Sequence, residues 1–216
     1  MTTSRTATPA RANRQPARRN DPEGLRRKVL DAAFGMFQTH GYNGTSMQDL
    51  TKTIEVTGGA LHHHFPTKRS IALAVFAERV APAVRETWID PVRAAPSFGQ
   101  GVQSAFDAII SSIDARGSTS GCPLNNLAME LSLADPDFRQ SANGVFREWQ
   151  EALAECIRET RAGRKMTKAA RNDAASFIVA SYSGAMSLAK AEQSTAPLRA
   201  AAGILKRWLQ AHELDR

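Results

Sequence analysis

Helix-start signals stand close together in the segment 45–68, and they leave room only for short helices. Thr45 and Ser46 can cap one helix that runs to about residue 53, and Thr57 can cap a second over 58–65, because their hydroxyl oxygens accept hydrogen bonds from first-turn N–H groups. The link 54–56 between them is tight. Two short helices joined in this way have the dimensions of a helix-turn-helix.

Longer helical patterns flank this segment on both sides. Asp21 is followed by a proline and an acid, which is typical of a helix start, and Gly41 ends the apolar spacing that follows. Lys68 begins another helix whose apolar spacing reaches toward Trp88, and Pro82 is a point where that helix kinks or ends.

From residue 97 onward the spacing is that of longer amphipathic helices separated by proline and glycine. The predicted ranges are 97–116, 123–134, 136–162, 168–192 and 196–212. The sequence therefore predicts an all-α fold, in which a three-helix helix-turn-helix domain over 21–68 precedes a larger helical bundle over 69–216.

Positive charge is concentrated at the N-terminal end of the chain. The net charge is +7, and 11 of the 28 Lys and Arg but only 5 of the 21 Asp and Glu lie within residues 1–70. Residues 1–20 hold five arginines, no acid and no apolar face, so the sequence predicts a disordered basic arm. Three interpretations of the arm stay open: a solubilising tail, an arm that follows DNA, and, least favoured, a transit peptide.

Other classes of protein are disfavoured. No apolar run reaches the ~18–20 residues of a membrane span, and two cysteines give no disulfide framework and suggest a reducing, cytoplasmic setting. The consecutive residues His62, His63 and His64 point about 100° apart on a helix, so the sequence predicts no metal site. We expect no catalytic set and no cofactor, and we interpret Cys122 as a buried small residue in preference to a redox switch.

Two motifs resemble the DNA-binding signature of the tetracycline-repressor (TetR/AcrR) family. They are Thr45-Ser46-Met47-Gln48-Asp49-Leu50 and Val56-Thr57-Gly58-Gly59-Ala60-Leu61-His62-His63-His64-Phe65-Pro66-Thr67-Lys68, within a resemblance that covers about residues 25–75. The segment 121–131 is similar to a ligand-domain segment in one branch of the family. The resemblance implies a homodimeric, non-enzymatic transcription regulator, usually a repressor, that leaves a palindromic operator when a small molecule binds.

The resemblance also implies DNA-contacting positions. By position in the motifs these are Thr45, Ser46, Gln48, Thr57, Gly58, Gly59, Ala60, His62, His63 and the phosphate-clamping Lys68. Three residues in the motif region depart from the family pattern. Glu55 stands where the family prefers glycine, Gly58 where a polar or basic residue is frequent, and His62 where tyrosine is common.

The C-terminal helices are expected to dimerise and to bind the effector. Ser176, Ala180 and Gly184 give one helix a flat face for dimerisation, and Leu205 and Trp208 belong to its partner in the last helix; packing within one chain is the alternative. The expected ligand-binding residues are Phe106, Ile110, Asn125, Met129, Phe146, Trp149, Phe177 and Tyr182. Ile109 and Ile113 belong to the same apolar faces. A nearly neutral domain with aromatic and amide groups favours a small, mainly apolar effector.

Two other functions stay open from the residues alone. A basic protein that binds DNA without sequence preference would show only a salt-dependent affinity. A helical carrier or enzyme with a vestigial DNA-binding domain would bind a small molecule and no DNA. The basic N-terminal third and Lys68 favour the regulator over the second alternative.

Overall fold

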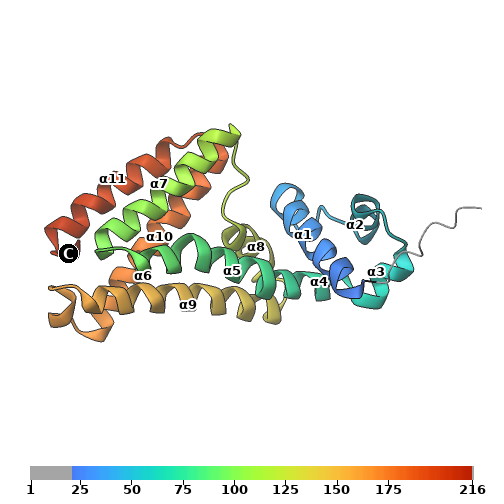
Figure 1. Ribbon diagram of the computed structural model, residues 1–216, viewed down its shortest axis with the longest axis horizontal. Helices are drawn as coiled ribbons and strands as arrows, with labels where there is room; N and C mark the ends of the chain where they lie inside the picture. Colours follow the sequence, from blue (N-terminus) through green and yellow to red (C-terminus); the bar gives the residue numbers. More distant parts are fainter. Residues whose placement is uncertain (1–20, 216) are drawn as a thin grey trace, which may run out of the picture.

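The computed structural model describes residues 21–215, and these residues form helices and connecting turns without a strand (Figure 1). The predicted all-α class is therefore confirmed, whereas the predicted basic arm 1–20 lies outside the described residues. The helices are α1 (Pro22–His40), α2 (Met47–Ile54), α3 (Gly58–His64), α4 (Lys68–Val75), η1 (Phe76–Val80), α5 (Ala81–Val84), η2 (Arg85–Ile89), α6 (Asp90–Ala94), α7 (Phe98–Arg116), α8 (Pro123–Leu131), α9 (Pro136–Glu159), η3 (Gly163–Lys165), α10 (Lys168–Glu192) and α11 (Ala196–Ala211).

Helices α1, α2 and α3 form an N-terminal unit at one end of the molecule (Figure 1). The side chains of Asp21, Ser46 and Thr57 each accept a hydrogen bond from the backbone N–H three residues ahead, at 2.8, 3.1 and 3.3 Å. These caps satisfy N–H groups that a helix start leaves without a partner. Leu50 of α2 and Leu61 of α3 are fully buried, so both short helices are held by packing as well as by their caps.

Five consecutive elements, α4 to α6, make one continuous helical path from Lys68 to Ala94. Pro82 neither ends nor interrupts this path, and the reason is the π turn of η1 directly before it. A proline cannot donate a backbone hydrogen bond and its ring crowds the carbonyl four residues back. The N–H of Ala81 instead pairs with the carbonyl of Phe76, five residues back. The same arrangement recurs in η2, directly before Pro91 of α6.

The remaining helices build the bundle around this path. Helix α9 runs along the side of the α4–α6 path, and α7 packs against α6 (Figure 1). Helix α10 packs against α9 and α11, and α11 packs against α7. An aromatic cluster marks the centre of the bundle. The ring centroid of Trp88 lies 5.3 Å from Phe106, 5.1 Å from Trp149 and 4.8 Å from Tyr182. Edge-on and tilted rings at such distances attract each other as well as filling the core.

Helix α7 approaches the end of the α4–α6 path very closely at Gly101. A Cβ atom built on Gly101 would lie 2.7 Å from the Cα of Val92 and 3.1 Å from the Cβ of Ala95. Both neighbours belong to the backbone or its first side-chain atom, so neither can turn aside. Only glycine permits this approach.

We expect Gly101→Ala to lower the free energy of unfolding by about 1–3 kcal/mol, because the added methyl group forces α7 away from α6. Gly144→Ala in α9 is the matched control. A Cβ there meets nothing within 4 Å, and replacing a helical glycine by alanine stabilises a helix by roughly 0.5–1 kcal/mol. Urea unfolding followed by circular dichroism measures both. Equal effects of the two substitutions would contradict the close approach.

Candidate functional site

The exposed end of the N-terminal unit carries most of the residues that the sequence assigned to DNA. Helix α3 ends the unit at the edge of the molecule (Figure 1). Ser46, Gln48, Thr57, Gly58, Gly59, His62 and His63 are all exposed, and Ala60 is half-buried. The surface formed by these seven exposed residues is called the α2–α3 surface below.

Thr45 is a correction to the expected DNA contacts. Its side chain is 1% exposed, and its hydroxyl donates a 2.8 Å hydrogen bond to the carbonyl of Gly41. The hydroxyl is therefore used inside the turn between α1 and α2, and Ser46 alone caps α2. We remove the Thr45 side chain from the set of candidate contacts.

Gly58 and Gly59 are not required by the packing of the protein itself. A Cβ atom on either residue would meet nothing within 4 Å among the described residues, and neither has a positive φ angle. Two glycines at the start of a helix cost roughly 1 kcal/mol each relative to alanine. Their positions therefore leave open space in front of the first turn of α3, where a partner can come close to the backbone.

Glu55 occupies a left-handed conformation in the turn between α2 and α3. Its φ angle is 55° and its ψ angle 47°, and its N–H bonds back to the carbonyl of Lys52 at 3.3 Å. This geometry explains why the family prefers glycine at the position, since glycine adopts it without strain. The Glu55 side chain is exposed beside the α2–α3 surface.

Lys68 and Glu130 hold the turn between α1 and α2 from opposite sides. The Lys68 ammonium donates to the carbonyls of Tyr42 at 3.0 Å and Thr45 at 2.9 Å, and it lies 4.2 Å from the centre of the Tyr42 ring. The Glu130 carboxylate, from α8, accepts from the N–H groups of Tyr42 at 2.8 Å and Asn43 at 2.7 Å. Lys68 is thus a structural clamp whose ammonium group is bound to the backbone of this turn.

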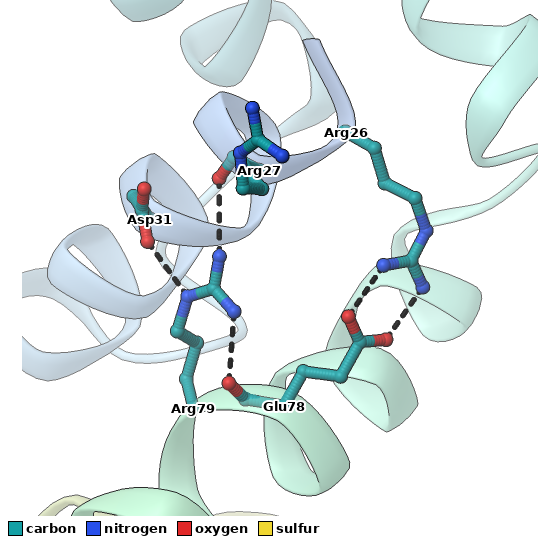
Figure 2. A network of polar contacts seen from close by, with 5 residues as sticks. All are labelled: Arg26, Arg27, Asp31, Glu78 and Arg79. Atoms are coloured by element: carbon teal, nitrogen blue, oxygen red, sulfur yellow. Dashed lines mark hydrogen bonds and ion pairs between the residues drawn. The ribbon is translucent and has the colours of Figure 1, made fainter. Parts of the chain in front are cut away.

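A second set of charged contacts joins α1 to η1 (Figure 2). Arg26 forms a two-pronged ion pair with Glu78, and Arg79 donates to Asp31 at 2.6 Å and to the backbone carbonyl of Arg27 at 3.4 Å. The hydrogen bonds from Arg26 lower the pKa of Glu78 below its ordinary value, which outweighs the opposing effect of partial burial.

The start of α9 is a third attachment. Asp135 caps this helix, since its carboxylate accepts the N–H of Asp137 at 2.8 Å. Both carboxylates also pair with Arg69 of α4. The hydrogen bond from Arg69 lowers the pKa of Asp135. The N-terminal unit and the helix that follows it are therefore fixed to the bundle at the α1–α2 turn, at η1 and at the start of α9.

A cavity of about 650 Å³ lies where the N-terminal unit meets the bundle. Five segments contribute to its wall: α1, the path from η2 to α6, α7 with the loop after it, the start of α8, and α10. Apolar and polar residues contribute to the lining in about equal measure, and the polar ones come from every part of the wall except α6 and the start of α8. The lining residues include Phe34, Gln38, Ile109, Ile113, Tyr182 and Met186.

The structure brings only part of the expected ligand-binding set to this cavity. Tyr182 lines it, and so do Ile109 and Ile113 from the same predicted faces. Phe106, Ile110 and Trp149 are at most 3% exposed and form part of the bundle core, with Phe106 and Trp149 in the aromatic cluster.

The other expected ligand-binding residues lie elsewhere. Asn125 donates to the carbonyl of Ser183 at 3.1 Å and fastens α8 to α10. Met129 is 86% exposed, Phe177 is 43% exposed, and Phe146 lines a separate groove between α8 and α9. Helical periodicity identified apolar faces, but it could not say which neighbour covers each face.

Sequence reasoning missed the two cavity residues on α1, Phe34 and Gln38. A signal was present, because Gln38 follows Phe34 by four residues and directly follows the buried Phe37. A polar side chain at the border of a buried helix face indicates either a partner or a site.

The structure places some of the expected dimer residues on the surface and others in the interior. Ala180 and Gly184 are exposed on α10, Ser176 is half-buried, and Trp208 packs on Phe177 with ring centroids 5.0 Å apart. Leu205 is 1% exposed and belongs to the core of its own chain, which corrects its assignment. The outward neighbour is Ile204, which is 55% exposed; Leu188 on α10 is equally exposed.

Three further observations concern residues 21–215 only. None of their helices is long and apolar enough to cross a membrane. No group of three or more His, Cys, Asp or Glu side chains among them could hold a metal ion. Cys122 is buried, and burial raises the pKa of its thiol, so this thiol is poorly suited to react as a thiolate.

Two family models match the chain. The model described as bacterial regulatory proteins, tetR family, matches residues 29–75, and the model of the C-terminal domain of LmrA/YxaF-like transcriptional regulators matches residues 99–204. The first range contains α2, α3 and most of α1, and the second extends from α7 into α11.

Individual proteins resemble the chain over most of its length. It is 26% identical over 182 residues to the HTH-type transcriptional repressor DhaR of a Mycobacterium species, covering 81% of this chain and 86% of that protein. It is 26% identical to the HTH-type transcriptional regulator LmrA of Bacillus subtilis, covering 80% and 90%. A TetR transcriptional regulator from Chloroflexus aurantiacus has a similar structure, with a TM-score of 0.75, 25% identity, and coverage of 88% and 96%.

The Arg26–Glu78 pair predicts a pH-dependent difference in stability. Because the pKa of Glu78 is lowered in the folded protein, its contribution is present above the ordinary carboxyl pKa and is lost as the pH falls through the lowered value. We expect Arg26→Met to lower the free energy of unfolding at pH 7 by at most about 1 kcal/mol, since both side chains are partly exposed. The difference from the wild type should shrink below about pH 4.

Lys28→Met in the same helix is the control, because it removes an equal charge and Lys28 forms no ion pair within the described part of the chain. Urea unfolding at pH 7 and at pH 3.5, at one protein concentration, separates the two variants. A deficit of Arg26→Met that stays constant with pH would contradict the role of the ion pair.

Proposed function

Because the chain belongs to the TetR family of bacterial transcriptional regulators, we propose that it is a homodimeric, one-component repressor that leaves a palindromic operator when a small molecule binds. The observation that carries the proposal is the α2–α3 surface, where Gly58 and Gly59 keep the start of α3 uncovered. Because a regulator of this kind acts on DNA, we place the protein in the cytoplasm, at the nucleoid.

We assign DNA recognition to the α2–α3 surface. The second helix of a helix-turn-helix enters the major groove with its N-terminal residues next to base edges. Thr57, Gly58, Gly59 and Ala60 occupy that place in α3, and His62 and His63 follow on its exposed side. Ser46 and Gln48 flank the groove from α2, and Lys68 supplies a positive charge at the start of α4.

We retain the domain division as part of the proposal. Residues 21–68 would bind DNA, and residues 69–216 would bind the effector and the second subunit. The helical path α4–α6 begins at the proposed boundary and reaches deep into the bundle. A rigid connection of this kind can transmit a change in the bundle to the DNA-binding domain.

We assign dimerisation to the outer face of α10 and α11. Ala180 and Gly184 form a low strip on α10, and the large apolar side chains of Phe177, Leu188 and Ile204 are exposed around it. Exposed apolar groups gathered on two adjacent helices are typical of an interface between subunits. A second copy of the chain fits this face because a twofold interface pairs a surface with itself.

We assign the effector to the cavity between α1, η2, α7 and α10. Its volume of about 650 Å³ lies in the range of small-molecule sites. In a dimer, the two copies of α3 must stand about 34–36 Å apart to enter successive major grooves. An effector that binds more tightly to a differently spaced arrangement lowers the affinity for the operator. The reduction is at most the ratio of the effector's affinities for the two arrangements.

The proposal predicts an inverted repeat in binding sites selected from random double-stranded DNA at about 150 mM salt. Gly59→Leu is expected to reduce binding of the selected sequence at least tenfold, because the new side chain fills the space through which α3 reaches the bases. The control is Gly144→Leu, on the exposed side of α9. A Cβ at either position meets nothing within 4 Å in the described chain, so neither variant should lose its fold.

Other outcomes of the selection contradict the proposal in different ways. Binding that only fades with rising salt, without an enriched sequence, would indicate a non-specific DNA-binding protein. A Gly59→Leu variant that binds the selected sequence as well as the wild type does would remove α3 from the interface. Absence of binding at any salt would contradict the DNA-binding function.

The dimer assignment predicts that Gly184→Trp produces a monomer. The indole would stand on the strip where the second subunit packs, whereas within one chain a Cβ at Gly184 meets nothing within 4 Å. Analytical ultracentrifugation measures the change, and Gly144→Trp is the matched control that should remain dimeric. If Gly184→Trp stays dimeric with unchanged affinity, the interface lies elsewhere on the chain.

A further inference from the structure

The polar side chains of α3 are all imidazoles. Its residues, Gly58–His64, begin with two glycines and an alanine, and Leu61 is fully buried. The side chains that remain are those of His62, His63 and His64, of which the first two are exposed and the third is half-buried. Any side-chain hydrogen bond from α3 to DNA therefore comes from histidine, the residue whose charge ordinarily changes between pH 5 and 8.

The ring of His62 is held in one tautomer. Its Nδ1 atom lies 3.2 Å from the carbonyl oxygen of Pro66. A carbonyl oxygen only accepts, so Nδ1 carries the hydrogen of this bond. In the neutral ring the other nitrogen, Nε2, then has a lone pair and no hydrogen. Protonation adds a hydrogen to Nε2 and makes it a charged donor, while the bond to Pro66 is kept.

The place of His62 on α3 favours a phosphate as the partner of Nε2. Residues four apart lie on the same face of a helix, so His62 lies one turn beyond Gly58. When the first turn of α3 is next to base edges, the following turn lies toward the rim of the groove and its phosphates. Phosphate oxygens in DNA accept hydrogen bonds and donate none. They therefore attract the imidazolium form, whereas the Nε2 lone pair of the neutral ring faces them without a hydrogen.

The protein itself gives His62 no counter-charge within the described part of the chain. Helix α3 packs against α1 and α2, and α4 follows it. The ionisable side chains of these helices and of the turn before α3 are Glu23, Arg26, Arg27, Lys28, Asp31, His40, Asp49, Lys52, Glu55, Lys68 and Arg69. Among residues 21–215, none of them forms an ion pair or a hydrogen bond with His62. Bound DNA would be the first anion to pair with the charged ring.

We propose that His62 binds a DNA phosphate as an imidazolium, through Nε2, so that operator binding takes up a proton at this residue. The inference rests on the proposed DNA-binding function and adds a form of regulation to it, because the affinity for the operator rises as the pH falls. A bound phosphate stabilises the charged ring, and by reciprocity the charged ring stabilises the complex. Each subunit of the dimer contributes one such proton.

Fluorescence anisotropy of the selected operator at pH 6, 7 and 8, at one ionic strength, tests the proposal on the full-length protein. His62→Gln keeps an amide donor but has no charge to gain. The matched control is His212→Gln, since the Nδ1 of His212 also bonds to a backbone carbonyl four residues away, that of Trp208 at 2.8 Å. His212 directly follows α11, whose C-terminal end lies at the opposite end of the molecule from α3 (Figure 1).

We expect the wild type and His212→Gln to bind the operator about tenfold or more tightly at pH 6 than at pH 8, which is the size of one charge-assisted hydrogen bond. The affinity of His62→Gln should change less with pH by that factor and should be close to that of the wild type at pH 8. Equal pH dependence of all three proteins would overturn the inference. Wild-type binding that weakens as the pH falls would also overturn it, because the neutral ring would then be accepting from a base.

Failure of the proposed function gives a different result. If the selection yields no operator, or if Gly59→Leu binds the operator as well as the wild type does, α3 does not contact the bases and the inference falls with that function. If Gly59→Leu loses binding but His62→Gln follows the wild type at every pH, the function stands and the proton uptake by His62 is wrong.

Discussion

The turn between α1 and α2 fixes the N-terminal unit to the bundle, because opposite charges from two different helices form hydrogen bonds with its backbone. Lys68 binds two of its carbonyls and Glu130 binds two of its N–H groups. Hydrogen bonds to charged groups are about twice as strong as those between neutral groups. Since Lys68 belongs to α4 and Glu130 to α8, neither helix can move far without changing the position of the α2–α3 surface.

Two prolines, Pro82 and Pro91, determine the local structure of the α4–α6 path. Each proline is accommodated by a π turn, and each π turn carries part of the functional arrangement. η1 presents Glu78 and Arg79 to α1 (Figure 2). η2 contributes Glu86 and Thr87 to the cavity wall. A regular α-helix would rotate the following residues differently. The attachment of α1 and the wall of the cavity thus each depend on a π turn, η1 and η2 respectively.

Local physical rules sufficed to predict the helices and most of the α2–α3 surface. The caps Asp21, Ser46 and Thr57 act over three residues, so sequence alone reveals them. Contacts between distant segments decided the rest. The sequence could not show that Leu205 turns inward or Met129 outward, nor that Gln38 meets Asn126, because each depends on how helices far apart in the chain are packed.

In the proposed function, an effector in the cavity would contact α1 as well as the bundle. A ligand that binds equally well in the two arrangements of a regulator shifts neither population, however tightly it binds. A cavity enclosed by the bundle alone would have to transmit its occupancy through α4–α6 or α8. Phe34 and Gln38 place part of the cavity wall on the DNA-binding unit. In the proposed function, a displacement of α1 from the bundle would therefore change the affinity for the effector, and by reciprocity the effector would change the position of α1.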